Sequence, residues 1–374
     1  MLFLKGDNMD RLYNFSAGPS QLPREVLERA QAELLSYQGS GMSVMEIGKT
    51  KESFKEILHG AEDALRKLMN IPSNYKILFM QGGASAQYAA IPMNLLSERR
   101  LADYIITGQC SRKAYTEAKK YGDIAIAASS SGALPTFSTV PRTQRSDFRP
   151  DADYVHICYN NTVYGTKFNE IPDTGNIPLV ADMSSCILSE PIDITKFGMI
   201  YASAQQNIST AGLTVVIIRG DLIGKARPDT PAVLNYKTML ESESMYNTPP
   251  IFSIYLARLV FDHILELGGL DEMKRRNEKK ASVLYDYLDN QSYYTASVDR
   301  NCRSMMNIVF TTGDGELDRL FVSGATDAGL LNLDGHASIG GMRASMYNSM
   351  PYDAAEKLVA FMKDFAVNNP KMQT

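Results

Sequence analysis

Short apolar runs alternate with helical patterns from the start of the 374-residue chain to about Gly269. Strands are expected at 76–80, 103–107, 154–159, 179–182, 199–204 and 214–219. Helices are expected at 24–37, 52–69, 111–121, 251–267 and 271–288. Strands that alternate with helices predict an α/β fold with a mostly parallel, covered sheet. The runs 155–158 and 214–218 are typical of strands buried on both faces.

The pattern changes after Gly269, where charged helical segments and shorter apolar runs follow. The last of these segments, 354–365, has the spacing of an amphipathic helix. A chain of this length has room for two domains. We therefore expect a large α/β domain at 24–269 and a small C-terminal α+β domain at 270–374. An N-terminal segment, 1–23, is expected to pack with the small domain.

Composition describes an ordinary globular protein and excludes several functional classes. Hydrophobic residues make up 44% and charged residues 21% of the chain, and the formal net charge is −4. No basic patch stands out, so nucleic acid is not an expected partner. The longest apolar runs are well short of the roughly 20 residues that a membrane span needs. The expected location is the cytoplasm, with no membrane partner.

Neither the cysteines nor the histidines have the spacing of a metal site. The cysteines lie far apart, at Cys110, Cys158, Cys186 and Cys302. The histidines form no metal-spaced cluster either: His59, His156, His263 and His336. Free thiols in a reducing compartment fit this pattern. Residues 1–8 contain too short an apolar run for a signal peptide, and Met9 opens a stretch that is typical of a natural start.

A small-residue segment, QGGASAQ at 81–87, follows an expected strand and opens a helical pattern. Small residues allow the backbone amides near Ala84 and Ser85 to approach an anion at a helix N-terminus. A tight strand-to-helix turn without a ligand explains the same residues equally well.

Asp182 ends the run PLVAD at 178–182. A carboxylate at the C-terminal end of a parallel strand faces the crevice where such sheets bind ligands. There it can keep a pyridine nitrogen protonated and so preserve the ring as an electron sink. An aspartate that caps the following turn is the alternative.

Two further segments carry polar groups suited to anionic ligands. Arg343, in GHASIGGMRAS at 335–345, suits bidentate recognition of a carboxylate or phosphate. Taken alone, such an arginine is more often a solvated surface residue. The segment SMYNTPP at 244–250 is a polar tip before a helix, and local chemistry alone favours a simple turn there.

The segment YASAQQNI at 201–208 resembles the cofactor loop of the phosphoserine aminotransferases. Other ordered matches to that family are YNFSAGP at 13–19, SVME at 43–46, the segment 79–95 and the Arg343 segment. The resemblance implies fold type I of the pyridoxal phosphate (PLP) enzymes, with a seven-stranded sheet in the large domain. It also implies a homodimer with shared sites and the conversion of 3-phosphohydroxypyruvate and glutamate to phosphoserine and 2-oxoglutarate.

The same resemblance assigns roles to individual residues. The cofactor-binding residues that it implies are Ala84, Ser85, Cys110, Thr162, Asp182, Gln205, Asn247 and Thr248. Asn247 and Thr248 are expected to reach the cofactor phosphate of a partner subunit. The substrate-binding residues that it implies are Lys49, His336 and Arg343. The expected ligand is a small phosphorylated or carboxylate molecule.

Two departures from the family pattern concern the cofactor. Gln206 stands where the family has the lysine that holds PLP as a Schiff base. Cys110, in TGQCS at 107–111, stands where a tryptophan stacks on the ring, and the chain contains no tryptophan. An amide has no titratable nitrogen, and loss of a general base alone lowers a rate by roughly 10²–10⁴-fold. PLP or pyridoxamine phosphate is therefore expected to bind noncovalently.

Two more departures concern the substrate. Lys49 and Thr50 stand where the family has His-Arg for the substrate phosphate, and Ala337 stands where an arginine follows His336. Four departures around one pocket indicate relaxed or redirected selection. The first interpretation is a phosphoserine aminotransferase-like protein, impaired or inactive as a transaminase. The alternatives are a pseudoenzyme that acts as a binding or regulatory partner, and a lysine-independent pyridoxamine phosphate enzyme.

Overall fold

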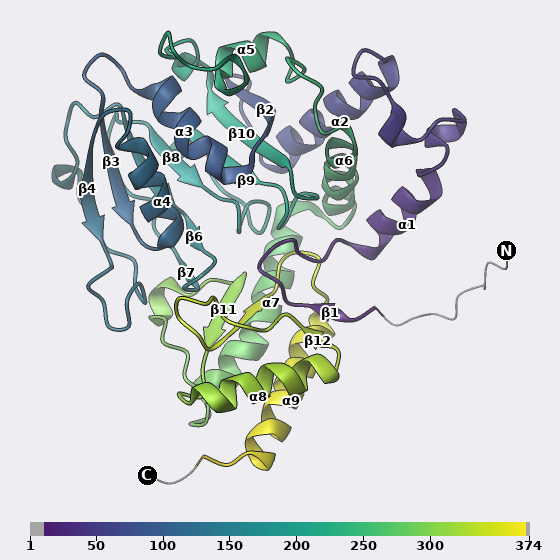
Figure 1. Cartoon of the computed structure of the whole chain (residues 1–374), viewed down its shortest axis with the longest axis vertical. Helices are drawn as coiled ribbons and strands as arrows, with labels where there is room; N and C mark the ends of the chain where they lie inside the picture. The colour runs from purple at the N-terminus through teal and green to yellow at the C-terminus, as the bar shows by residue number, and fades with distance from the viewer. Residues whose placement is uncertain (1–10, 372–374) are drawn as a thin grey trace.

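A computed structural model describes residues 11–371 of the chain (Figure 1). The interpretation of residues 1–8 and Met9 lies outside this range. A sheet flanked by helices forms the upper part of the molecule in Figure 1, and the C-terminal helices α7–α9 form the lower part. Within residues 11–371, no helix is both long and apolar enough to cross a membrane.

The central sheet has seven strands in the order β2-β10-β9-β8-β5-β3-β4. Six of them run parallel, and β10 runs antiparallel to both its neighbours, β2 and β9. The strand bounds are β2 (Tyr75–Gln81), β3 (Leu101–Ile106), β4 (Asp123–Ser129), β5 (Tyr154–Cys158), β8 (Leu179–Asp182), β9 (Met199–Ser203) and β10 (Leu213–Arg219). The predicted α/β class and mostly parallel sheet are confirmed.

Helices cover both faces of this sheet, so alternate residues of one strand enter different cores. Ile77 and Phe79 of β2 pack with α2 (Glu52–Leu68) and α6 (Ile251–Glu266). Leu78 and Met80 pack on the other face with three different helices, α3 (Gly83–Leu95), α4 (Gln109–Ala118) and α5 (Tyr236–Glu241). Burial on both faces explains why these strands are continuous apolar runs.

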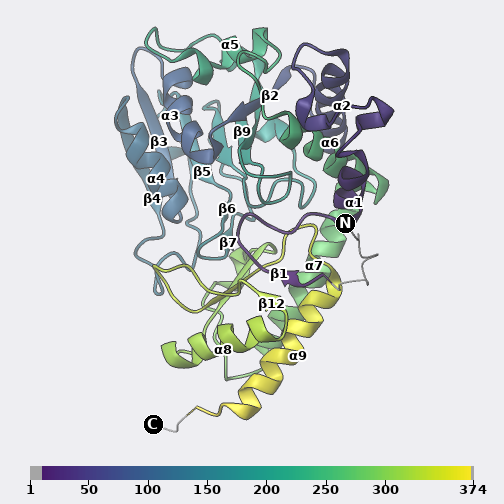
Figure 2. The ribbon, with the colours of Figure 1, turned by 45° about the vertical axis from the view of Figure 1, so that its right-hand side comes forward.

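A separate core lies among the C-terminal elements and includes Phe15 from the N-terminal segment. Its elements are α7 (Gly269–Asp289), β11 (Asn307–Phe310), α8 (Gly315–Asp327), β12 (Leu330–Leu331), β13 (Met342–Ser345) and α9 (Tyr352–Asn368). Strand β1 (Tyr13–Asn14) pairs in parallel with β12, and Figure 2 shows them side by side. Residues from the two ends of the chain therefore share one core.

Three sequence predictions differ clearly from the structure. The predicted helix 111–121 is α4, which begins at Gln109 and ends at Ala118. Helix α1 (Arg24–Glu33) ends before the predicted residue 37, because Ser36 is extended and Tyr37 is buried against the Tyr255 ring, 5.9 Å away. Strand β4 was absent from the predicted strands. It lies at the sheet edge and contains small, mostly unburied residues, so its apolar signal is weak.

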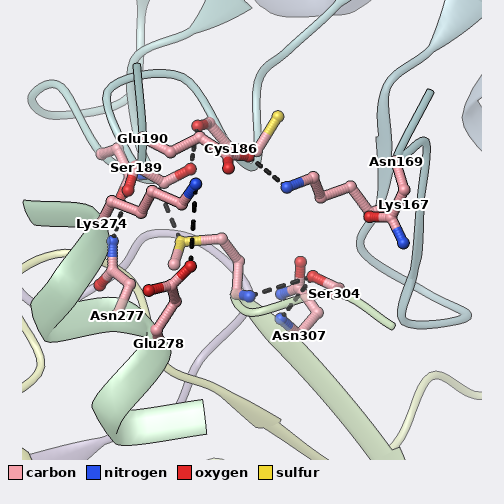
Figure 3. Close-up of polar contacts among 12 residues, drawn as sticks. Lys167, Asn169, Cys186, Ser189, Glu190, Lys274, Asn277, Glu278, Ser304 and Asn307 are labelled. Atoms are coloured by element: carbon pink, nitrogen blue, oxygen red, sulfur yellow. Dashed lines mark hydrogen bonds and ion pairs between the residues drawn. The ribbon is translucent and has the colours of Figure 1, made fainter. Parts of the chain in front are cut away.

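Polar contacts join the sheet region to the C-terminal elements (Figure 3). Lys167, in β7 (Thr166–Lys167), forms an ion pair with Glu190, and their side chains are only 10% and 12% exposed. Asn277 of α7 donates a hydrogen bond to the Ser189 carbonyl oxygen at 3.0 Å. Because these charged and polar groups are buried, the free-energy cost of removing them from water is offset only while both partners of each contact are present.

We predict that Glu190→Ala lowers the free energy of unfolding by about 3–5 kcal/mol, because it leaves the Lys167 ammonium buried without a counter-charge. Urea unfolding of the variant measures the change. The matched control is Glu278→Ala, which removes the exposed pair with Lys274 and should change stability by less than about 1 kcal/mol. Equal effects of the two variants would show that burial of the Lys167–Glu190 pair is energetically unimportant.

Candidate active site

Four parallel strands, β3, β5, β8 and β9, end at one edge of the sheet, and β2 runs in the same direction through its pairing with β10. The residues that follow these strands therefore lie at one edge of the sheet, and parallel sheets bind ligands in the crevice outside this edge. This arrangement places the segments after positions 81, 106, 158, 182 and 203 together, although they are far apart in the sequence.

The turn from β2 into α3 leaves the backbone open to a close ligand. Gly82 and Gly83 have φ angles of 95° and 64°, which favour glycine. A Cβ at Gly82 would lie 2.5 Å from the Ala86 Cβ. The first amides of a helix have no intrahelical acceptor, and here they belong to Gly83, Ala84 and Ser85. The predicted anion cradle thus has suitable local geometry.

Asp182 is 4% exposed at the end of β8. Its Oδ1 accepts hydrogen bonds from the Ser184 amide at 3.0 Å and the Ser184 hydroxyl at 2.7 Å. Burial raises the pKa of this carboxyl, and the Ser184 hydrogen bonds oppose that shift. No lysine or arginine within residues 11–371 pairs with Asp182 in the structure. A cationic ring nitrogen is the counter-charge that this buried carboxylate lacks.

Cys110 lies in the first turn of α4, two residues after Gly108. Gly108 packs so closely on Asn161 that a Cβ at this position would lie 2.6 Å from the Asn161 Oδ1. A hydrogen bond from Cys158, at the end of β5, lowers the pKa of the Cys110 thiol. Tyr88 of α3 also contacts Cys110, so three different elements meet here. Cys110 is small and therefore cannot cover a ligand ring as a large aromatic side chain would.

Gln206 follows β9 and is 8% exposed. Its Nε2 donates to the Ala17 carbonyl oxygen and to the Tyr347 hydroxyl, both at 2.8 Å. The neighbouring Gln205 accepts a hydrogen bond from the Ser203 hydroxyl at 2.6 Å. Both amide protons of Gln206 are therefore engaged by the N-terminal segment and by the segment after β13.

Tyr347 is a site residue that the sequence reasoning did not assign. Its hydroxyl donates to the Ala17 carbonyl oxygen at 2.9 Å and accepts from Asn307 Nδ2 at 3.1 Å. Burial raises its pKa to about 12. The sequence signal was its position just after the Arg343 segment, but only the fold places its hydroxyl against Gln206.

Arg343 lies on β13 and faces the segment after β5. Its Nη1 is 3.5 Å from the Thr162 carbonyl oxygen, while its Nε is buried without a hydrogen-bond partner. Burial lowers the pKa of Arg343 from its ordinary value. His336 is exposed nearby in the chain and contacts the Ser338 hydroxyl at 2.8 Å. An anionic ligand would satisfy the unpaired guanidinium nitrogen.

The structure does not bring Lys49 to Arg343 or His336. The Lys49 amine donates to the Met245 carbonyl oxygen at 2.9 Å. Beside it, Gln81 of β2 donates to the Thr248 carbonyl oxygen at 3.0 Å and contacts Asn247 at 3.4 Å. These three predicted residues thus lie near the end of β2, and within residues 11–371 none of them forms a hydrogen bond with Arg343 or His336, which we call the Arg343 group.

The described residues fit a PLP-type cofactor. An open helix N-terminus suits its phosphate, and the buried Asp182 suits its ring nitrogen. The side chain after β9 is an amide rather than an amine, so it offers hydrogen bonds but no imine-forming nitrogen. Within residues 11–371 no group of three or more histidine, cysteine or acidic side chains is placed to hold a metal ion.

Comparison with known proteins gives consistent matches over nearly the whole chain. The family model Aminotransferase class-V matches residues 12–358. The phosphoserine aminotransferase of Bacillus cereus is 48% identical over 361 residues, which is 96% of this chain and 100% of the relative. That of Pseudomonas aeruginosa is 50% identical over 355 residues, 95% of this chain and 98% of the relative.

Solved structures agree with the sequence matches. The phosphoserine aminotransferase of Bacillus circulans subsp. alkalophilus has a TM-score of 0.93 at 44% identity, covering 96% of this chain and 99% of that one. The PLP-bound enzyme of Trichomonas vaginalis has a TM-score of 0.88 at 40% identity, covering 94% and 100%. This chain therefore belongs to the class-V aminotransferases and, within them, to the phosphoserine aminotransferase family, for which PLP is the implied cofactor.

Proposed function

We propose that this protein binds PLP or pyridoxamine phosphate without a covalent bond and is impaired or inactive in phosphoserine transamination. The observation that carries the proposal is Gln206, which follows β9 in the crevice and uses its amide in two hydrogen bonds. A phosphoserine aminotransferase that is 43% identical to this chain contains a Schiff base. We infer that Gln206 occupies the position of the amine that forms such a bond.

Within residues 11–371, no lysine forms a hydrogen bond with Gln206. Lys196 and Lys225 are exposed and lie on other segments. Lys49 donates to the Met245 carbonyl oxygen beside the end of β2. The Tyr347 hydroxyl contacts Gln206, but burial raises its pKa to about 12, so it is a poor base near neutral pH.

The remaining residues support binding of the cofactor. The α3 amides at Ala84 and Ser85 would hold its phosphate, and Asp182 would hold its ring nitrogen. Thr162 would contact the ring from one side, and Gln205 would stabilise the loop that follows β9. Bound PLP supplies an electron sink for bonds next to an amino group. Cys110 leaves the ring less covered than a tryptophan would.

Substrate recognition is proposed to be weaker than in active relatives. Arg343 retains an unpaired Nε and would bind a carboxylate. His336 and Lys49 are the other retained cationic or polar groups, but Thr50 and Ala337 offer no charge to a phosphate. A lysine is a point charge and does not reproduce the fork of an arginine.

We propose two explanations for the altered site beyond simple impairment. A pseudoenzyme would keep the fold and the cofactor as a binding or regulatory partner. A lysine-independent enzyme would use pyridoxamine phosphate, for which no imine-forming side chain is needed. The engaged amide protons of Gln206 favour a structural role for this residue and hence the first explanation.

We also propose how the chain divides into domains, where the protein is located and how it assembles. The large domain would span residues 24–269 and the small domain 270–374, with residues 1–23 packing against the latter, and the protein would be cytoplasmic. Asn247, Thr248 and Lys49 lie apart from the Arg343 group in one chain. A homodimer with shared sites would explain that separation, because one subunit would complete the site of the other.

The first prediction concerns attachment of the cofactor. Purified protein with added PLP should give no borohydride-trapped pyridoxyl group on residue 206, because an amide nitrogen does not form an imine. Mass spectrometry of the reduced protein makes the measurement, and Gln206→Lys is the positive control. A reduced pyridoxyl group on any crevice lysine, Lys49 above all, would refute noncovalent binding.

The second prediction concerns restored activity. Gln206→Lys should regain covalent PLP but little turnover, and adding Thr50→Arg and Ala337→Arg should raise phosphoserine formation from 3-phosphohydroxypyruvate and glutamate stepwise. Each restored charge-assisted hydrogen bond contributes roughly 1.5–3 kcal/mol. Gln206→Met, which has similar volume and no amine, is the matched control.

Turnover near one per second by the unmodified protein, within the usual range of enzymes, would contradict impairment. A triple variant that binds PLP covalently but stays inert would instead favour a site redirected to other chemistry.

The third prediction concerns assembly. The protein should sediment as a dimer at micromolar concentration, because Asn247, Thr248 and Lys49 form no hydrogen bond with Arg343 or His336 of their own chain within residues 11–371. Coexpression of a Thr248→Ala chain with an Asp182→Ala chain tests shared sites, since each mixed dimer would contain one cofactor site without either change. A monomer, or equal PLP affinity in all combinations, would refute the shared arrangement.

A further inference from the structure

A groove of about 980 Å³ lies outside the crevice, between the N-terminal segment, the end of α6, α7 and the start of α9. Figures 1 and 2 show β1, α7 and α9 together in this part of the molecule. None of Asp182, Gln206 and Arg343 lines the groove. The groove is therefore separate from the proposed cofactor site, and the proposed function gives it no role.

The groove is strongly cationic in a chain whose net charge is −4. Among residues 11–371, its lining contains seven lysines and arginines and two acidic residues, Glu25 and Asp353. Arg275 and Arg276 share a single carboxylate, Glu272, at 2.7 and 2.8 Å. The lining thus carries a local excess of positive charge that neighbouring acids only partly neutralise.

Three of these cations have partners other than carboxylates. Arg11 Nη1 donates to the Leu22 carbonyl oxygen at 2.7 Å, and the Lys279 amine lies 4.1 Å from the Tyr352 ring centroid. The Lys280 amine donates to the Tyr347 carbonyl oxygen at 2.7 Å and is buried. No ion pair within residues 11–371 joins Arg11, Lys279 or Lys280 to an acid.

Like charges also lie close together among the residues that line the groove. Burial and the nearby Arg24 lower the pKa of Arg11. Burial and Arg276, one helical turn away, lower the pKa of Lys280 to about 7. Such pairs destabilise a folded chain unless something compensates them. Arg24 and Arg276 pair with Glu28 and Glu272, whereas a bound anion would supply the counter-charge that Arg11 and Lys280 lack within residues 11–371 and would favour the charged form of Lys280.

We propose that this groove binds a compact oxyanion with at least two phosphate or carboxylate groups. Arg275 already makes two hydrogen bonds to Glu272 and Arg276 makes one, so Arg276 keeps donors for an anion. Lys279 of α7 and Arg11 of the N-terminal segment line the same groove and would contact a second anionic group. An anion with several charges matches the excess of lining cations better than a monovalent one does. Phosphate and carboxylate sources share this chemistry, so both are tested.

Isothermal titration of the full chain with inorganic pyrophosphate and, separately, with citrate tests the site at low salt. The variant is Arg11→Ala with Lys279→Ala, because both side chains are exposed and their removal leaves the buried Lys280 contacts intact. We expect the variant to bind the preferred anion at least tenfold more weakly. The matched control, Lys67→Ala, removes an exposed cation of α2 and should change affinity less than twofold.

Binding of pyrophosphate alone would identify a phosphate site, and binding of citrate alone would identify a carboxylate site. Binding of both anions would show that the site recognises the chemistry that they share. Each of these outcomes supports the proposal if the groove variant binds the anion more weakly. Unchanged affinity in the groove variant would overturn the proposal, because the anion would then sit elsewhere, such as the α3 cradle. Equal weakening in Lys67→Ala, or no binding of either anion at millimolar concentration, would overturn it too. Neither result bears on cofactor attachment at residue 206.

Discussion

The Gln206 side chain joins three parts of the chain that are far apart in sequence. Its amide bonds the Ala17 carbonyl oxygen and the Tyr347 hydroxyl, and Tyr347 also donates to Ala17. The loop after β9, the N-terminal segment and the segment after β13 thus meet at one buried point. Any change of residue 206 must break or replace these bonds, so its chemistry and the local structure are coupled.

Two charged groups, the buried Asp182 and the half-buried Arg343, form no ion pair within residues 11–371. Asp182 lies at the end of β8, where burial raises its pKa, and Arg343 has an unpaired Nε. The hydrogen bonds from Ser184 to Asp182 and the contact of Arg343 with the Thr162 carbonyl oxygen offset the desolvation of these groups only in part. A ligand that carries a cationic ring nitrogen and an anionic group would offset both. The retained pair therefore favours a site that still binds a ligand, even where the reactive amine is missing.

Much of the fold was predictable because its signals are local. Parallel strands buried on both faces read as continuous apolar runs, and β8 begins and ends at its predicted residues. The edge strand β4 lacked that signal, and α1 ended early because Tyr37 packs on Tyr255. The direction of β10 was not readable from its own residues, since an antiparallel strand between two covered faces has the same apolar pattern.

The sequence by itself determined which side chains are available: an amide at 206, a cysteine at 110, and no arginine at 50 or 337. Tertiary structure decided which of them meet. It brought the Tyr347 hydroxyl to Gln206, kept Lys49 with Met245 rather than with Arg343, and gathered cations of α7 and the N-terminal segment around one groove. The physical reason is that composition and spacing record chemistry along the chain, whereas contacts between distant segments depend on strand order and on helix packing.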